Sequence, residues 1–128
     1  MRVLLDTHAL LWWTQDDPRL SAKARAVITS FRNEVYVSAA SAWEIATKVR
    51  IGKLPGAEAF VSALPERLQQ LSFRQLPITV SHAQRAGLLA GTHRDPFDRM
   101  LIAQALTEDL PLVSNESLFD HYMVKRIW

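Results

Sequence analysis

The chain has 128 residues, of which 48% are hydrophobic and 22% charged, and its formal net charge is +2. These values are ordinary for a soluble globular protein, so we expect a single domain over residues 1–128 and exclude a globally disordered chain. The absence of cysteine excludes disulfides, thiolate catalysis and cysteine-ligated zinc.

Short apolar stretches alternate with helical ones through the first half of the chain. Ser21 and Ser38 each precede a helical stretch, and a serine hydroxyl can accept the free N–H groups of a first helical turn. Gly52 is typical of a helix end. We expect, in order, a strand over residues 2–5, a helix over 9–13, a helix over 22–30, a strand over 34–37 and a helix over 38–50.

The same alternation continues in the second half. It predicts a helix over residues 55–71, a strand-like run over 73–78 interrupted by Pro77, helices over 81–90 and 96–106, a strand over 112–114, a helical turn over 118–122 and a last strand over 124–128. Short apolar strands that alternate with helices are typical of an α/β fold. We therefore expect a mostly parallel central sheet of four to five strands flanked by helices.

Acidic side chains stand near the ends of the expected strands. Asp6 directly follows the first strand, although it is also suited to cap the helix that begins at Ala9. Glu44 lies inside the helix after the second strand. Ser41 precedes it with capping-box spacing, but the alanines upstream extend the helix toward Ser38. We therefore expect Glu44 to lie past the first turn, free for another role.

Two further acids open the helix expected over residues 96–106. Asp95 precedes Pro96 and has the signature of an N-cap, because proline fits the first helical position. Asp98 stands near the positive end of the same helix and opens an apolar stretch that must pack inward, so we favour a ligand role for it. Glu116 follows the next strand, where a first-turn acid of a short helix is the alternative interpretation.

A parallel sheet can bring these acids together, since functional groups gather at the carboxyl ends of its strands near a topological switch point. We expect Asp6, Glu44, Asp98 and Glu116 to converge at one edge. Carboxylates held together repel one another unless a cation is present, and Mg²⁺ or Mn²⁺ prefers oxygen ligands. Such a site suits phosphodiester hydrolysis, because a metal lowers the pKa of a bound water and neutralises charge on the phosphate.

Four stretches of the chain resemble the PIN-domain family, and in particular its VapC-type toxins. They are residues 4–12 (LLDTHALLW), 38–45 (SAASAWEI) with 52–54 (GKL), 95–105 (DPFDRMLIAQA), and 112–116 (LVSNE) with the closing 124–128. The resemblance spans nearly the whole chain. It implies a PIN-like fold and a Mg²⁺- or Mn²⁺-dependent endoribonuclease that cuts RNA such as transfer RNA or ribosomal RNA. It also implies a homodimer that is inhibited by a small antitoxin.

Carried over position by position, the resemblance implies metal ligands and catalytic residues at Asp6, Glu44, Asp98 and Glu116. Asp6 and Asp98 are expected to hold the principal metal, Glu44 to complete that site or orient the attacking water, and Glu116 to assist. The family usually has Asp at the position of Glu116, so we expect this longer side chain to bind a second metal weakly or through water. Arg99 is expected to contact substrate phosphate, with an ion pair to Asp95 or another neighbour as the alternative.

Other side chains carry weaker expectations. Thr7 and Ser114 are expected to support the carboxylates by hydrogen bonds. The histidines show no metal-ligand spacing, and the zinc pattern HExxH is absent. Trp12 and Trp13 cannot both lie on one helix face, so we expect one of them to face a partner.

Two other functions compete with the nuclease hypothesis. The first is a catalytically weak binding module of the same fold that acts with its antitoxin at DNA, a reading that Glu116 keeps open. The second is a phosphotransfer enzyme with Asp6 as nucleophile, which is disfavoured because His8 stands where a second Asp would be needed and no phosphate-binding glycine loop is present.

Charge and hydropathy indicate which substrates and which cell compartment to expect. The slight positive charge permits a polyanionic substrate without arguing for one, because the basic residues are scattered. Asp6 comes too early for the apolar core of a signal peptide. No apolar run approaches the roughly 20 residues that a membrane span needs. We therefore expect a cytoplasmic protein without membrane contact.

Overall fold

The computed structural model describes all 128 residues, and its centre is a five-stranded parallel sheet with the order β3-β2-β1-β4-β5. The strands are β1 (Arg2–Leu5), β2 (Glu34–Ser38), β3 (Arg74–Leu76), β4 (Leu112–Val113) and β5 (Arg126–Ile127). The expected parallel sheet of four to five strands is confirmed, with five strands that all run parallel.

Strand β1 occupies the middle of the sheet and decides where the carboxyl ends meet. Leu5 is level with Val37 of β2 on one side and with Val113 of β4 on the other. The chain therefore leaves these three strands at the same edge. Because β2 and β4 lie on opposite sides of β1, this edge is the topological switch point of the sheet.

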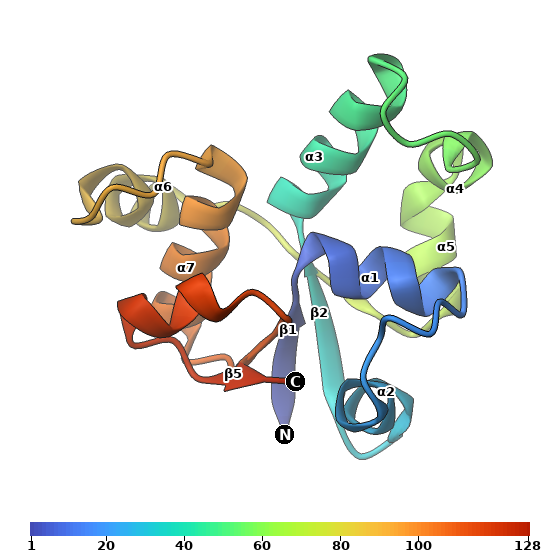
Figure 1. Cartoon of the computed structure of the whole chain (residues 1–128), viewed down its shortest axis with the longest axis horizontal. Coiled ribbons are helices and arrows are strands. Elements are labelled where there is room, and N and C mark those ends of the chain that lie inside the picture. Colours follow the sequence, from blue (N-terminus) through green and yellow to red (C-terminus); the bar gives the residue numbers. More distant parts are fainter.

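Helices cover both faces of the sheet (Figure 1). They are α1 (Thr7–Thr14), α2 (Ala22–Thr29), α3 (Ala39–Arg50), α4 (Glu58–Ser62), α5 (Leu64–Gln70), α6 (Val80–Leu88), α7 (Pro96–Glu108) and the 3₁₀ helix η1 (Ser117–Tyr122). None of them is both long and apolar enough to cross a membrane.

Two hydrophobic clusters fill the space between the sheet and the helices. Leu5 belongs to the cluster that α1, α2, α3 and α5 cover, whereas its neighbour Leu4 belongs to the cluster under α7 and η1. Successive side chains of a strand point to opposite faces, so this split follows from the apolar run in β1. A strand that is buried on both faces is typical of a parallel sheet.

Helix starts agree with the sequence analysis, but one expected helix is wrong. Ser21 and Ser38 cap α2 and α3, each by accepting a backbone N–H. The single helix expected over residues 55–71 is instead two short helices that break at Ala63, where the backbone leaves the helical region. Pro65 explains the break, because a proline inside a helix lacks the N–H donor and clashes with the preceding turn.

Candidate metal centre

Asp6 lies at the switch point, between the end of β1 and the start of α1. Its Oδ1 atom accepts a hydrogen bond of 2.7 Å from the Ala9 backbone N–H, so it caps α1. The residue is only 4% exposed. Burial raises its pKa to about 6, although the hydrogen bonds from Ser114 and Ala9 act in the opposite direction. Asp6 therefore caps α1, and its burial disfavours the charged form of its carboxyl group.

Glu44 approaches the same edge from α3. The helix begins after Ser38, so Glu44 lies in its second turn, as expected. Thr7 donates a hydrogen bond of 2.6 Å to Oε1, and the Lys48 ammonium donates to Oε2 at 2.5 Å. Both carboxylate oxygens of this buried residue are thus held by a neighbour. Thr7 gives the hydrogen-bond support that the sequence analysis expected of it.

Asp98 lies in the first turn of α7, after Asp95 as the N-cap. Asp95 Oδ1 accepts the backbone N–H groups of Phe97 and Asp98, which confirms its expected capping role. The Oδ2 atom of Asp98 lies 2.9 Å from Nε2 of His93. Partial burial raises the pKa of Asp98, and the charges of Asp95 and Glu44 add to this effect, while His93 opposes it.

His93 is a site residue that the sequence analysis missed. It lies on the loop before α7, five positions ahead of Asp98, so no helical or strand periodicity relates the two residues. Such a contact depends on the path of the loop, so no spacing rule could have found it.

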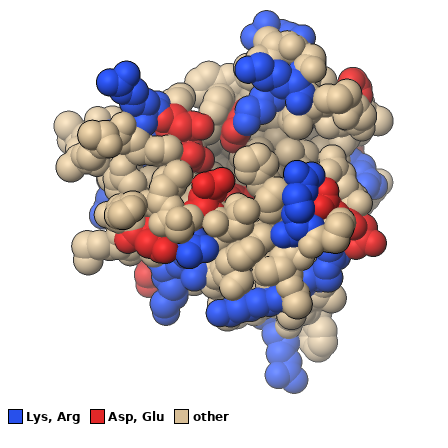
Figure 2. Space-filling view, in the orientation of Figure 1, with Lys and Arg blue, Asp and Glu red and all other residues tan.

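Three carboxylates from separate parts of the chain are electrostatic neighbours at this edge. The charge of Asp98 raises the pKa of Asp6, and the charge of Glu44 raises that of Asp98. Figure 2 shows acidic side chains gathered in a hollow in the middle of this face, with Lys and Arg side chains around it. However, no three His, Cys, Asp or Glu side chains lie close enough together to hold one metal ion.

Comparison with known proteins shows the family. Residues 3–124 match the model of the PIN domain. The chain belongs to the PIN domain family.

Two curated relatives of this PIN domain come from Mycobacterium tuberculosis. Ribonuclease VapC22 is 31% identical over 115 residues, which cover 89% of this chain and 86% of the relative. Ribonuclease VapC16 is 44% identical over 73 residues, or 54% of this chain, and the match spans only half (50%) of that relative's length.

Solved structures share the PIN fold at low sequence identity. VapBC-1 from nontypeable Haemophilus influenzae gives a TM-score of 0.70 at 16% identity, and the match covers 98% of this chain and 96% of that one. A toxin-antitoxin complex from Klebsiella pneumoniae gives a TM-score of 0.63 at 17% identity, with 90% and 87% covered. At these identities the likeness concerns the fold alone.

Glu116 follows the end of β4 by three residues in this PIN domain. It occupies the N-cap position of η1, but its side chain makes no capping bond. Its backbone N–H donates to the hydroxyl of the buried Ser114 at 3.0 Å. The part in the site that is expected of Glu116 stays a prediction.

Arg99 contacts backbone carbonyls and forms no ion pair with Asp95, while its expected phosphate contact stays a prediction. Its guanidinium donates to the backbone carbonyl oxygens of Ala86, Leu89 and His93 at distances of 2.7 to 3.2 Å. These carbonyls belong to the end of α6 and the following loop, where a positive charge is favourable. Arg99 is therefore committed to holding the PIN fold together beside the site.

The exposed tryptophan of this PIN domain is not the expected one. Trp12 is buried, stacked on His8 at 5.4 Å between ring centroids, and Trp13 packs against the same core cluster. Trp43 is 63% exposed and meets Phe97 edge-on at 5.0 Å. Trp12 is thus enclosed in the core and Trp13 is only partly buried, and the expectation that one of them faces a partner stays a prediction.

Proposed function

We propose that this protein is the toxin of a type II toxin–antitoxin system and hydrolyses RNA phosphodiester bonds as a Mg²⁺-dependent endoribonuclease, with Mn²⁺ as a possible substitute. The observation that carries the proposal is the group of neighbouring acids Asp6, Glu44 and Asp98 at the switch point of a PIN sheet. The identity to ribonuclease VapC22 over 89% of the chain supports it.

The donor chemistry of these acids fits a hard divalent cation. All three offer carboxylate oxygens, and two have a raised pKa because charge is poorly solvated there. We propose that Asp6 and Asp98 hold the ion, that Glu44 completes the site or orients water, and that Glu116 assists. The chemistry that the ion supplies when bound is neutralisation of phosphate charge and activation of water.

The partners follow from the same resemblance. We propose that RNA of the transfer or ribosomal class is the substrate, that a small antitoxin inhibits the enzyme, and that two copies of the chain form a homodimer. Residues 1–128 would then be one nuclease domain, acting on RNA in the cytoplasm.

Cleavage of labelled transfer and ribosomal RNA tests the nuclease activity. Wild type should cleave with Mg²⁺ or Mn²⁺ and stop with EDTA. Asp6→Asn and Asp98→Asn should each lose at least about 100-fold in rate, consistent with the several kcal/mol that metal-assisted charge stabilisation supplies. Asp109→Asn is the matched control, because this exposed residue lies at the far end of α7 and adopts a left-handed backbone that Asn tolerates. Equal cleavage by wild type and Asp6→Asn would remove the nuclease proposal.

A catalytically weak binding module is the second candidate. One observation favours it: no three His, Cys, Asp or Glu side chains lie close enough together to hold one metal ion. Expression of the chain without its antitoxin separates the two functions. The nuclease predicts growth arrest that Asp98→Asn lifts, whereas the binding module predicts that both forms behave alike and bind promoter DNA only with the antitoxin.

A further inference from the structure

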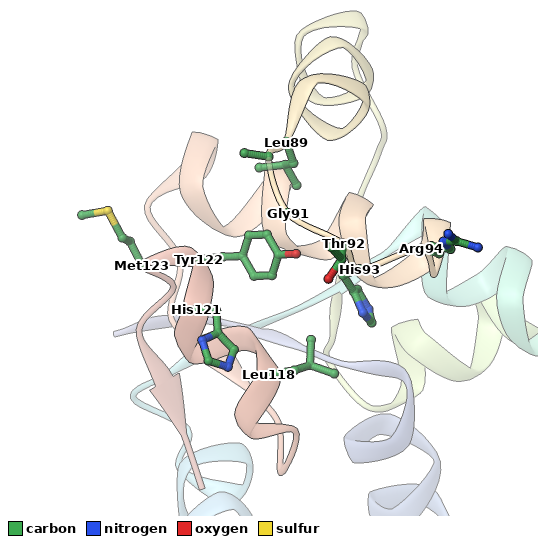
Figure 3. A pocket seen from close by; sticks show the side chains of 10 residues that line it. Leu89, Gly91, Thr92, His93, Arg94, Leu118, His121, Tyr122 and Met123 are labelled. Carbon is green, nitrogen blue, oxygen red and sulfur yellow. The ribbon is translucent and has the colours of Figure 1, made fainter.

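A cavity of about 840 Å³ lies beside the acidic site, between the loop 89–94 and η1. Leu118, His121, Tyr122 and Met123 complete its lining, and Figure 3 shows the Tyr122 ring reaching from η1 toward the loop near Gly91 and Thr92, with the His121 ring lower down beside Leu118. Its size falls within the roughly 300–1,000 Å³ that small-ligand pockets occupy.

The wall formed by Tyr122 and the loop depends on a glycine. Gly91 has φ +105°, and a Cβ atom added there would lie 2.9 Å from the Tyr122 hydroxyl oxygen. Only glycine allows this backbone conformation and this close approach together. The Tyr122 ring thus packs against the loop backbone, and this packing forms one wall of the cavity.

Apart from His93, the polar side chains that line this cavity make no polar side-chain contacts of their own within the protein. Thr92, Arg94, His121 and Tyr122 make no side-chain hydrogen bond or ion pair within the chain, whereas Arg99 nearby is fully engaged with backbone carbonyls. In Figure 3 the Arg94 side chain extends from the rim, past His93 and away from the centre of the cavity. The cavity therefore offers aromatic surfaces inside and a free cation at its edge.

His93 joins this cavity to the acidic site. Its imidazole lies 2.9 Å from Asp98 Oδ2, and the same residue lines the cavity. The cavity therefore lies within reach of the nucleotide next to a phosphate held at the acids.

We propose that the cavity binds one nucleotide unit of the RNA substrate, next to the phosphate that is cleaved, with its base against His121 and Tyr122 and a backbone phosphate near Arg94. Aromatic side chains bind bases of any identity by stacking, and arginine pairs with phosphate. This inference rests on the proposed ribonuclease function and assigns a substrate subsite to it.

The test measures RNA binding rather than cleavage. Fluorescein-labelled oligouridine and oligoadenosine of about ten nucleotides, a length within the usual range of single-strand sites, are titrated with the full chain in EDTA and followed by anisotropy. His121→Ala should weaken binding by roughly 5- to 100-fold, the usual effect of losing one stacked base. Tyr122→Phe should weaken it by roughly 2- to 10-fold through the lost hydroxyl, and Arg94→Ala should weaken it and reduce its salt dependence.

Matched controls lie away from the cavity. Tyr36→Phe changes a half-buried tyrosine on β2, and Arg67→Ala removes an exposed arginine on α5; both should bind like wild type. Thermal melting identifies any variant that is not folded. A 4-thiouridine oligonucleotide should crosslink under ultraviolet light to the peptide that contains residues 117–123.

The outcomes separate this inference from the proposed function. If wild type cleaves RNA but all three cavity variants bind like their controls, or the crosslink lies only elsewhere, the subsite is wrong and the nuclease stands. If wild type does not cleave but the cavity variants lose RNA and the crosslink maps to η1, the cavity is an RNA site of a non-catalytic protein.

Discussion

Nε2 of His93 lies 2.9 Å from Oδ2 of Asp98, so a loop imidazole holds the acid that opens α7. Partners of this kind orient a ligand, and their loss typically costs 10- to 100-fold in metal affinity or activity. We therefore expect His93→Ala to reduce both the Mg²⁺ affinity, measured by calorimetry, and the cleavage rate by roughly that factor.

A double-mutant cycle tests whether His93 acts through Asp98. In an Asp98→Asn background, His93→Ala should have little further effect on Mg²⁺ affinity. His93→Gln, which keeps a donor group, should retain part of the affinity. Independent, additive losses in the double variant would contradict this positioning role.

Asp6→Asn should make the metal-free protein more stable near neutral pH. The pKa of Asp6 is about 6 in the fold against an ordinary value of 3.8, so between about pH 4 and 6 the folded state holds a proton that the unfolded state releases. Stability therefore falls as the pH rises through this window, by about 3 kcal/mol in total for a shift of roughly two pKa units. Asparagine avoids this loss and still caps α1.

Urea denaturation in EDTA at pH 4 and pH 7 measures this effect. The free energy of unfolding of Asp6→Asn should exceed that of wild type by up to about 3 kcal/mol at pH 7 and match it at pH 4. Asp109→Asn, on an exposed residue, should show no such dependence on pH. A destabilised Asp6→Asn at pH 7 would show that burial of Asp6 carries no cost.

Thr7→Val should lower the free energy of unfolding, because the Glu44 carboxylate loses a hydrogen-bond donor. The Thr7 hydroxyl donates to Glu44 Oε1 at 2.6 Å and lies 3.0 Å from the Ser41 hydroxyl, in a buried setting. Valine keeps the shape and removes the donor, which leaves a buried carboxylate oxygen without this partner at a cost of about 1–3 kcal/mol. Urea denaturation of Thr7→Val and Thr7→Ser compares the two, and the serine variant should lose much less.

Arg99→Lys should destabilise the fold although the charge is kept. A lysine ammonium cannot reach several carbonyls with the geometry of a guanidinium fork, so the carbonyls of Ala86, Leu89 and His93 would lose donors. We expect a loss of about 2–3 kcal/mol in unfolding free energy. Arg85→Lys is the control, since Arg85 is exposed and makes one long contact of 3.3 Å with Thr107; an equal loss in both variants would refute the assigned role of Arg99.

Local rules found most elements and several caps. Ser21, Ser38 and Asp95 cap the helices that follow them because short polar side chains satisfy free N–H groups within a few residues. Asp6 illustrates the limit of such rules, because the capping interpretation and burial at the switch point are both correct. The capping role is local and could be predicted, whereas the burial of Asp6 depends on the central position of β1 in the sheet.

The sequence alone determined the alternation of strands and helices, the capping residues and the presence of acids at strand ends, because these depend on neighbours within a few positions. Only the tertiary structure decided that β1 lies between β2 and β4, that His93 meets Asp98, and that Arg99 binds the end of α6. These contacts join residues through the path of loops and the order of strands, which packing of the whole chain fixes and local propensity does not.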